Sequence, residues 1–136
     1  MYLIDTNVIS EARKGKRANS GVIQFFRATP ATERYLAVQT IGEIRRGVEN
    51  IRRRGDQLQA LQLEAWLNAV VVEYGARILS FDVDCAQVWG RLTAPQASQL
   101  IDKQIAAIAL IYQLRIVTRN VQDFSSTSVE LLNPFV

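Results

Sequence analysis

Short apolar runs and longer helical stripes alternate along the chain. Apolar runs bounded by turn-forming residues predict five buried strands, at residues 2–4, 35–38, 77–81, 115–118 and 129–132. Apolar residues at helical spacing predict helices at residues 8–12, 20–28, 41–51, 57–74 and 101–112, and one more headed by Asp82 and Asp84. This alternation predicts an α/β fold, with a central parallel sheet flanked by helices.

Local signals indicate where several helices begin and end. Asn19 or Ser20 is suited to cap the second helix, and we interpret Asp82 as the cap of the fifth. Gly75 is a candidate carboxyl cap. Thr40 followed by Glu43 matches a capping box, in which the glutamate would tie down the start of its own helix.

The helix predicted at residues 57–74 has a wide apolar face for a domain of this size. Its apolar residues are Leu58, Leu61, Leu63, Trp66, Leu67, Val70, Val71 and Tyr74. A face this wide predicts that part of the helix meets another chain, either a second copy or a different partner.

Composition narrows the available chemistry. The 136 residues fit one domain, 1–136, and contain no histidine and a single cysteine, Cys85. Cys85 shares helical core spacing with Trp89, which predicts a packed thiol. Without histidine the chain cannot build a Ser-His-Asp triad or a histidine metal site. Carboxylates and amides must therefore carry any acid–base or metal chemistry.

Charge is distributed unevenly along the chain. Residues 1–54 contain 11 Lys and Arg against 5 Asp and Glu, whereas residues 55–136 contain 5 against 8. A basic half suits a polyanionic partner, although a solvated surface gives the same pattern. The candidate phosphate contacts are Lys14, Lys16, Arg17, Arg45 and Arg46, with the first three forming a loop expected near Asp5. No leader or membrane span is recognisable, so we expect a cytoplasmic protein.

Four acids stand just after a predicted strand or at the start of a predicted helix: Asp5, Glu43, Asp102 and Asp123. Each alone has an ordinary interpretation as a cap or turn residue. In an alternating β/α chain, however, these positions share one edge of the sheet. Clustered carboxylates need either raised pKa values or bound cations. An oxygen-only ligand set favours Mg²⁺ or Mn²⁺, and such a site supports phosphodiester hydrolysis.

Five segments resemble the motifs of PIN-domain ribonucleases of the VapC toxin type, in the order and spacing of that family. They are LIDTNVISE at 3–11, TIGEIRRG at 40–47, ILSFDVDCAQVWGRL at 78–92, IDKQIAAIAL at 101–110 and IVTRNVQDF at 116–124. The resemblance implies a compact α/β fold with a parallel sheet and Mg²⁺- or Mn²⁺-dependent endoribonuclease activity on RNA. It also implies neutralisation by a cognate antitoxin.

The resemblance also assigns roles to residues. Asp5, Glu43 and Asp102 would form the acidic metal site. The fourth acid falls two or five residues after the motif's threonine, at Asn120 or Asp123. We favour Asp123 as the acid, with Asn120 positioning metal-bound water or phosphate. The supporting residues would be Thr6 and Asn7, which orient Asp5, and Thr118, whose hydroxyl faces the site.

Other functions would require different residues at these positions. A haloacid-dehalogenase-like phosphatase needs a second aspartate two residues after the first, where this chain has Asn7. A receiver-like phosphoacceptor needs a late lysine, where this chain has Arg119. A catalytically silent α/β interaction module needs none of the acids. For a toxin we expect a homodimer inhibited by an antitoxin that packs along residues 41–71, anchored at Leu63 and Trp66, with an arginine near the acids.

Overall fold

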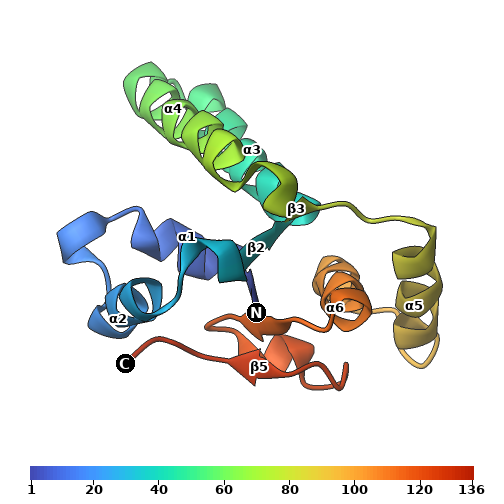
Figure 1. The fold of residues 1–136 in the computed structure, drawn as a ribbon. Helices are drawn as coiled ribbons and strands as arrows, with labels where there is room; N and C mark the ends of the chain where they lie inside the picture. The colour runs from blue at the N-terminus through green and yellow to red at the C-terminus, as the bar shows by residue number, and fades with distance from the viewer.

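The computed structural model describes residues 1–136 and contains a five-stranded parallel sheet (Figure 1). The strands are β1 (Tyr2–Ile4), β2 (Arg34–Ala37), β3 (Ile78–Leu79), β4 (Arg115–Val117) and β5 (Leu131–Leu132), in the spatial order β3-β2-β1-β4-β5. In β1, Tyr2 pairs with Arg34 on one side and Arg115 on the other. All five carboxyl ends therefore lie along one edge of the sheet, as the sequence predicts.

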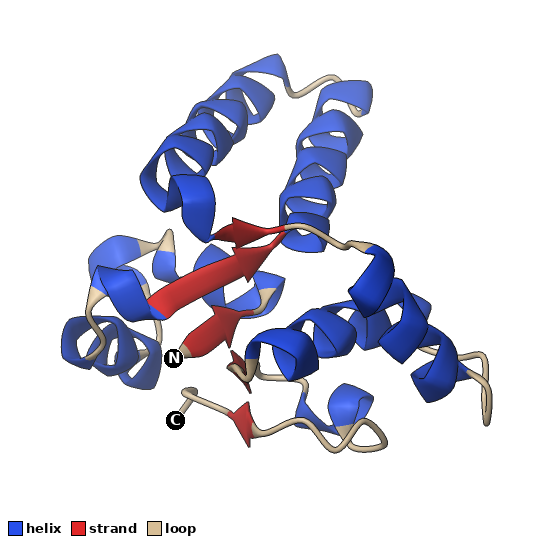
Figure 2. Ribbon diagram, turned by 45° about the vertical axis from the view of Figure 1, so that its right-hand side comes forward, coloured by secondary structure: helices blue, strands red, loops and turns tan.

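Six α-helices cover the two faces of this sheet (Figure 2). They are α1 (Thr6–Ala12), α2 (Ser20–Ala28), α3 (Val38–Arg53), α4 (Gln57–Tyr74), α5 (Val83–Thr93) and α6 (Leu100–Tyr112). The hairpin of α3 and α4 extends away from the sheet, at the top of Figure 1. No helix combines the length and apolar character needed to cross a membrane.

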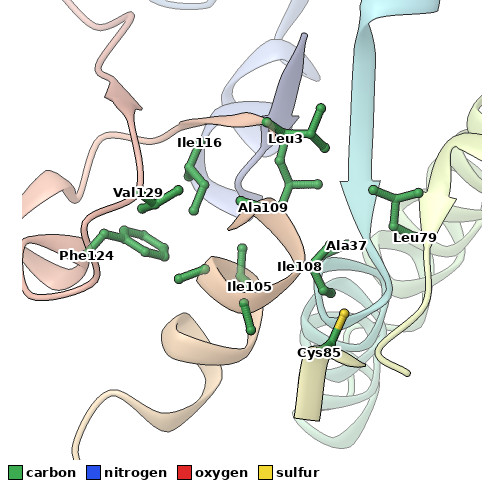
Figure 3. Packing of buried hydrophobic residues seen from close by; sticks show 13 residues of the cluster. Leu3, Ala37, Leu79, Cys85, Ile105, Ile108, Ala109, Ile116, Phe124 and Val129 are labelled. Atoms are coloured by element: carbon green, nitrogen blue, oxygen red, sulfur yellow. The ribbon is translucent and has the colours of Figure 1, made fainter. Parts of the chain in front are cut away.

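Successive strand residues contribute to two separate cores, because side chains alternate between the faces of a strand. Leu3 and Ile116 belong to the cluster that packs on α5 and α6, together with Cys85 and Phe124 (Figure 3). Ile4 and its neighbours in β2 and β4 pack on α1 to α4. The buried thiol of Cys85 confirms the prediction of a core cysteine.

Most predicted helix ends are confirmed. The side chain of Asn19 accepts hydrogen bonds from Gly21 and Val22 at the start of α2, and Asp82 accepts one from the Cys85 amide at the start of α5. Gly75, with φ of 48°, ends α4. Two strands are shorter than predicted: β3 spans only Ile78–Leu79, with Arg77 in a 3₁₀ turn before it, and β5 spans only Leu131–Leu132.

The predicted capping box at Thr40 is wrong. The strand β2 passes directly into α3, which begins at Val38 after the extended residue Ala37. Thr40 is therefore fully buried inside the helix rather than at its end. Glu43 lies more than a turn inside α3, so its carboxylate is not needed to cap this helix.

Candidate active site

Asp5 is the most tightly held acid at the carboxyl edge of the sheet. It follows β1, is 6% exposed, and caps α1 by accepting a hydrogen bond from the Thr6 amide at 2.9 Å. The Asn7 amide group and the Thr118 hydroxyl donate to its other oxygen at 3.1 and 2.8 Å. Burial raises the pKa of Asp5, and these three hydrogen bonds partly oppose that shift.

Glu43 is connected to the same edge through α1. The Thr6 hydroxyl donates a hydrogen bond to Glu43 Oε1 at 2.7 Å, which joins the first turn of α1 to α3. Thr6 thus contacts two acids, through its amide and through its hydroxyl.

Asp102 lies in the first turn of α6 and is partly exposed. Its pKa is raised to about 6, mainly by burial and then by the negative charges of Asp5, Asp123 and Glu43. Three acids from other segments of the chain therefore act on Asp102 at this edge. The neighbouring Lys103 is buried and donates to the Gln96 carbonyl at 2.8 Å, so it does not neutralise them.

A small amide and hydroxyl network completes the edge. Asn7 Nδ2 donates to Thr118 Oγ1 at 3.2 Å as well as to Asp5, while Asn7 Oδ1 accepts from the Arg119 amide at 2.9 Å. The Asn120 amide donates to Thr118 Oγ1 at 3.0 Å, whereas its side chain makes no hydrogen bond. The predicted supporting residues therefore lie together, with Asn120 bound through its backbone.

Residues 2–129 match the sequence profile of the PIN domain family. The chain belongs to the PIN domain family. It is 32% identical to plasmid stability protein StbB of Pseudomonas syringae pv. tomato and 29% identical to toxin FitB of Neisseria gonorrhoeae, over 99% of this chain and of each relative. It is 27% identical to VapC ribonuclease Y4jK of Sinorhizobium fredii, over 99% of this chain and 98% of the relative.

Solved structures agree with this membership. The crystal structure of FitAcB from Neisseria gonorrhoeae matches with a TM-score of 0.86 and 28% identity over 98% of both chains. DNA-bound VapBC from Salmonella typhimurium matches with a TM-score of 0.77 at 19% identity, over 98% of this chain and 97% of that one, which shows the shared fold. Membership in the PIN family decides against the phosphatase-like and receiver-like alternatives.

The predicted basic contacts lie apart from the acids of this PIN domain. The loop of Lys14, Lys16 and Arg17 follows the far end of α1, a seven-residue helix that begins next to Asp5. A helix of this length separates the loop from Asp5 by about 10 Å, whereas the sequence predicted that the two lie close together. Lys14 pairs with Glu11 at 2.9 Å. Lys16 and Arg17 are exposed.

The two predicted arginines of α3 differ from each other. Arg45 pairs with Glu49 of its own helix and with Glu64 of α4, so its charge is engaged in the hairpin. Arg46 is exposed and lies one turn beyond Glu43, which makes it the better candidate of the two for an anion.

One polar pair near the site carries no signal in the sequence. Gln39 Nε2 donates to Gln104 Oε1 at 3.2 Å, which links the helix of Glu43 to the helix of Asp102. Neither glutamine belongs to a recognisable motif, and only the packing of α3 on α6 brings them together. The pair connects the two helices that carry these acids.

Asp102→Asn is expected to stabilise the metal-free PIN domain near neutral pH. The folded chain holds the Asp102 proton up to about pH 6, whereas an unfolded chain releases it near pH ~3.9. Protonated Asp102 therefore favours the fold at low pH, and this contribution is lost as the pH rises through about 6. After screening by solvent, the substitution should add about 1 kcal/mol near neutral pH and almost nothing near pH ~4.

Urea unfolding in chelator across this pH range measures the difference. Asp84→Asn, an exposed acid at the head of α5, is the matched control and should leave the pH dependence unchanged. An Asp102→Asn protein with the pH dependence of the wild type would contradict the coupling of Asp102 to the other acids.

Proposed function

We propose that this PIN domain is a metal-dependent endoribonuclease and the toxin of a toxin-antitoxin pair, acting on cytoplasmic RNA. The observation that carries the proposal is the oriented carboxylate of Asp5, which three donors hold at the carboxyl edge of the sheet, with Glu43 joined to the same turn through Thr6. The raised pKa of Asp102 agrees with further negative charge at this edge. A relative named VapC ribonuclease and one named toxin FitB support it.

The donor set suits a hard divalent cation, Mg²⁺ or Mn²⁺. Asp5 and Asp102 are the best candidate ligands, with Glu43 and Asp123 beside them; all four offer oxygen only and repel one another. As they lie, no three of these acids converge closely enough to hold an ion alone. Mg²⁺ typically binds one or two carboxylates and completes its shell with water and substrate phosphate, which fits this arrangement. The ion would supply charge stabilisation and an activated water.

The chain's own residues prepare this chemistry. Three donors fix both oxygens of Asp5, so its carboxylate is oriented before any ligand binds. Thr6 holds Glu43 against the start of α1. The side-chain amide of Asn120 is exposed and uncommitted, so it can position a water or a phosphate oxygen, while Asp123 serves as the fourth acid.

The test is cleavage of a panel of RNAs with and without Mg²⁺, beside Asp5→Asn. Metal-dependent cleavage that Asp5→Asn removes is expected. A silent interaction module predicts no cleavage by either protein. A different Mg²⁺-dependent phosphohydrolase would leave RNA intact but hydrolyse a phosphomonoester such as p-nitrophenyl phosphate.

The exposed cations are proposed to contact RNA phosphates, so RNA affinity should fall with salt. Combined Lys16→Gln and Arg17→Gln should flatten the plot of log affinity against log salt by about 0.7 per lost contact. Arg45→Gln is the matched comparison and should leave the slope unchanged, because Arg45 is engaged by Glu49 and Glu64. Anisotropy titrations of labelled single-stranded RNA measure this, and equal slopes in all variants would contradict the loop's role.

For the partner, we propose an antitoxin bound along residues 41–71 and a homodimer of the toxin. Several solved neighbours are toxin-antitoxin complexes, such as FitAB bound to IR36 DNA, which matches at 26% identity over 98% of this chain and 95% of that one, with a TM-score of 0.75. In this chain, Trp66 lines a hollow of about 200 Å³ between α1, α2 and α4. An arginine from the antitoxin would then enter the acid edge and offset its charge.

A further inference from the structure

Arg119 is an exposed cation beside the acid edge; it lies within the fourth motif, but the sequence assigns it no role. The backbone amide of Arg119 donates to Asn7 Oδ1 at 2.9 Å, and Asn7 Nδ2 in turn donates to Asp5. The backbone of Arg119 is therefore attached to the group that orients Asp5.

The guanidinium of Arg119 is free to bind an anion. It makes no ion pair and no side-chain hydrogen bond, unlike Arg45, Arg52 and Arg115, which all pair with glutamates. Its charge acts on Glu11, whose pKa is lowered first by Lys14 and the Asn19 amide, with a smaller contribution from Arg119. Glu11 is thus already engaged, and Arg119 keeps its donors available.

Phe135 holds the guanidinium in place. The carbon Cζ of Arg119 lies 4.8 Å from the centre of the Phe135 ring, a cation-π contact that uses none of the guanidinium's N–H donors. The segment around Phe135 is itself fixed, because Asn19 donates to the Val136 carbonyl at 2.9 Å and accepts from its amide at 3.2 Å. An ordered, unpaired arginine loses little entropy on binding.

Arg119 shares a hollow with one of the four acids, Asp123. It measures about 330 Å³ and is lined by residues 119–123, with Arg119 among them and the fourth acid, Asp123, at the other end of the segment. The charge of Asp123 acts on both Asp5 and Asp102. A phosphate bound next to Asp123 would therefore occupy the same hollow as Arg119.

We infer that Arg119, held by Phe135, binds a backbone phosphate of single-stranded RNA next to the scissile one. This inference rests on the proposed ribonuclease function and adds a substrate contact to it.

The test measures binding of a short fluorescein-labelled RNA of mixed sequence in chelator, where no cleavage occurs. Arg119→Gln should weaken binding about 5- to 10-fold and reduce the salt slope by about 0.7. Arg119→Lys should retain the slope, and Phe135→Leu should weaken binding about 2- to 3-fold. Arg115→Gln, at the other end of β4 and paired with Glu130, is the matched control and should bind as the wild type does.

The outcomes separate this inference from the function on which it rests. If the wild type binds and cleaves RNA but Arg119→Gln has the same affinity and salt slope as Arg115→Gln, only the inference about Arg119 is overturned. A wild type that neither binds nor cleaves any RNA overturns both. Circular dichroism and melting temperature of each variant check the fold, and Arg119→Lys and Phe135→Leu carry the test if Arg119→Gln does not fold.

Discussion

Asp5→Asn should lower RNA cleavage by roughly a thousandfold while the protein stays folded. A divalent cation contributes several kcal/mol to stabilising the charge that develops on a reacting phosphate, and each ~1.4 kcal/mol is tenfold in rate. Asparagine keeps the shape of Asp5 and can still accept from the Thr6 amide, but it removes the negative charge. Asp102→Asn should give a similar loss for the same reason.

Single-turnover cleavage at saturating Mg²⁺ measures this loss, with Asp84→Asn as the matched control that should cleave normally. Thermal melting with Mn²⁺ provides a readout that needs no substrate: the wild type should be stabilised and Asp5→Asn should not. A stable Asp102→Asn protein with full activity would show that Asp102 only starts its helix.

The fold could be predicted because strand ends and helix starts are encoded locally. The apolar run of β1 ends abruptly at Asp5, and the same transition recurs where β4 ends at Thr118. Parallel pairing then carries these ends to one edge without further information. Proximity of the four acids was therefore predictable from topology alone.

The hydrogen bonds within that edge were not predictable to the same degree. A capping-box pattern at Thr40 competes with the true start of α3 at Val38, and only the absence of a loop after β2 decides between them. Glu43 consequently has a tertiary partner, Thr6, 37 positions away. Side-chain pairing between distant segments depends on packing, which no local pattern contains.

The roles of the basic residues were also not predictable, because they too depend on packing between distant segments. Sequence shows that Arg45 and Arg46 are adjacent, but only the α3–α4 hairpin brings Glu64 to Arg45. Arg119 lies within a motif, but its role is not evident there, because it depends on Phe135 and Asn7, which come from other segments. Charge counts therefore indicate a basic half, whereas the structure decides which of its charges are free.

Combined Leu63→Ala and Trp66→Ala should weaken antitoxin binding by about 2–4 kcal/mol, or roughly thirtyfold to a thousandfold. Both side chains are partly exposed on α4, and Trp66 borders the hollow with Phe26 and Tyr74, where a partner's apolar residue can be buried. Arg13 stacks over the Trp66 ring at 5.7 Å, which adds a charged rim to an aromatic anchor. Large aromatic residues in such hollows typically dominate the affinity of an interface.

Titration calorimetry with the cognate antitoxin measures the loss, and inhibition of RNA cleavage should weaken in parallel. Val83→Ala, a 74% exposed apolar residue on α5 across the sheet, is the matched control and should bind normally. The double variant removes a partly buried ring, so circular dichroism must first show an intact fold. Undiminished affinity in a folded double variant excludes this surface, because a helix-in-groove contact cannot lose its anchors and keep its strength.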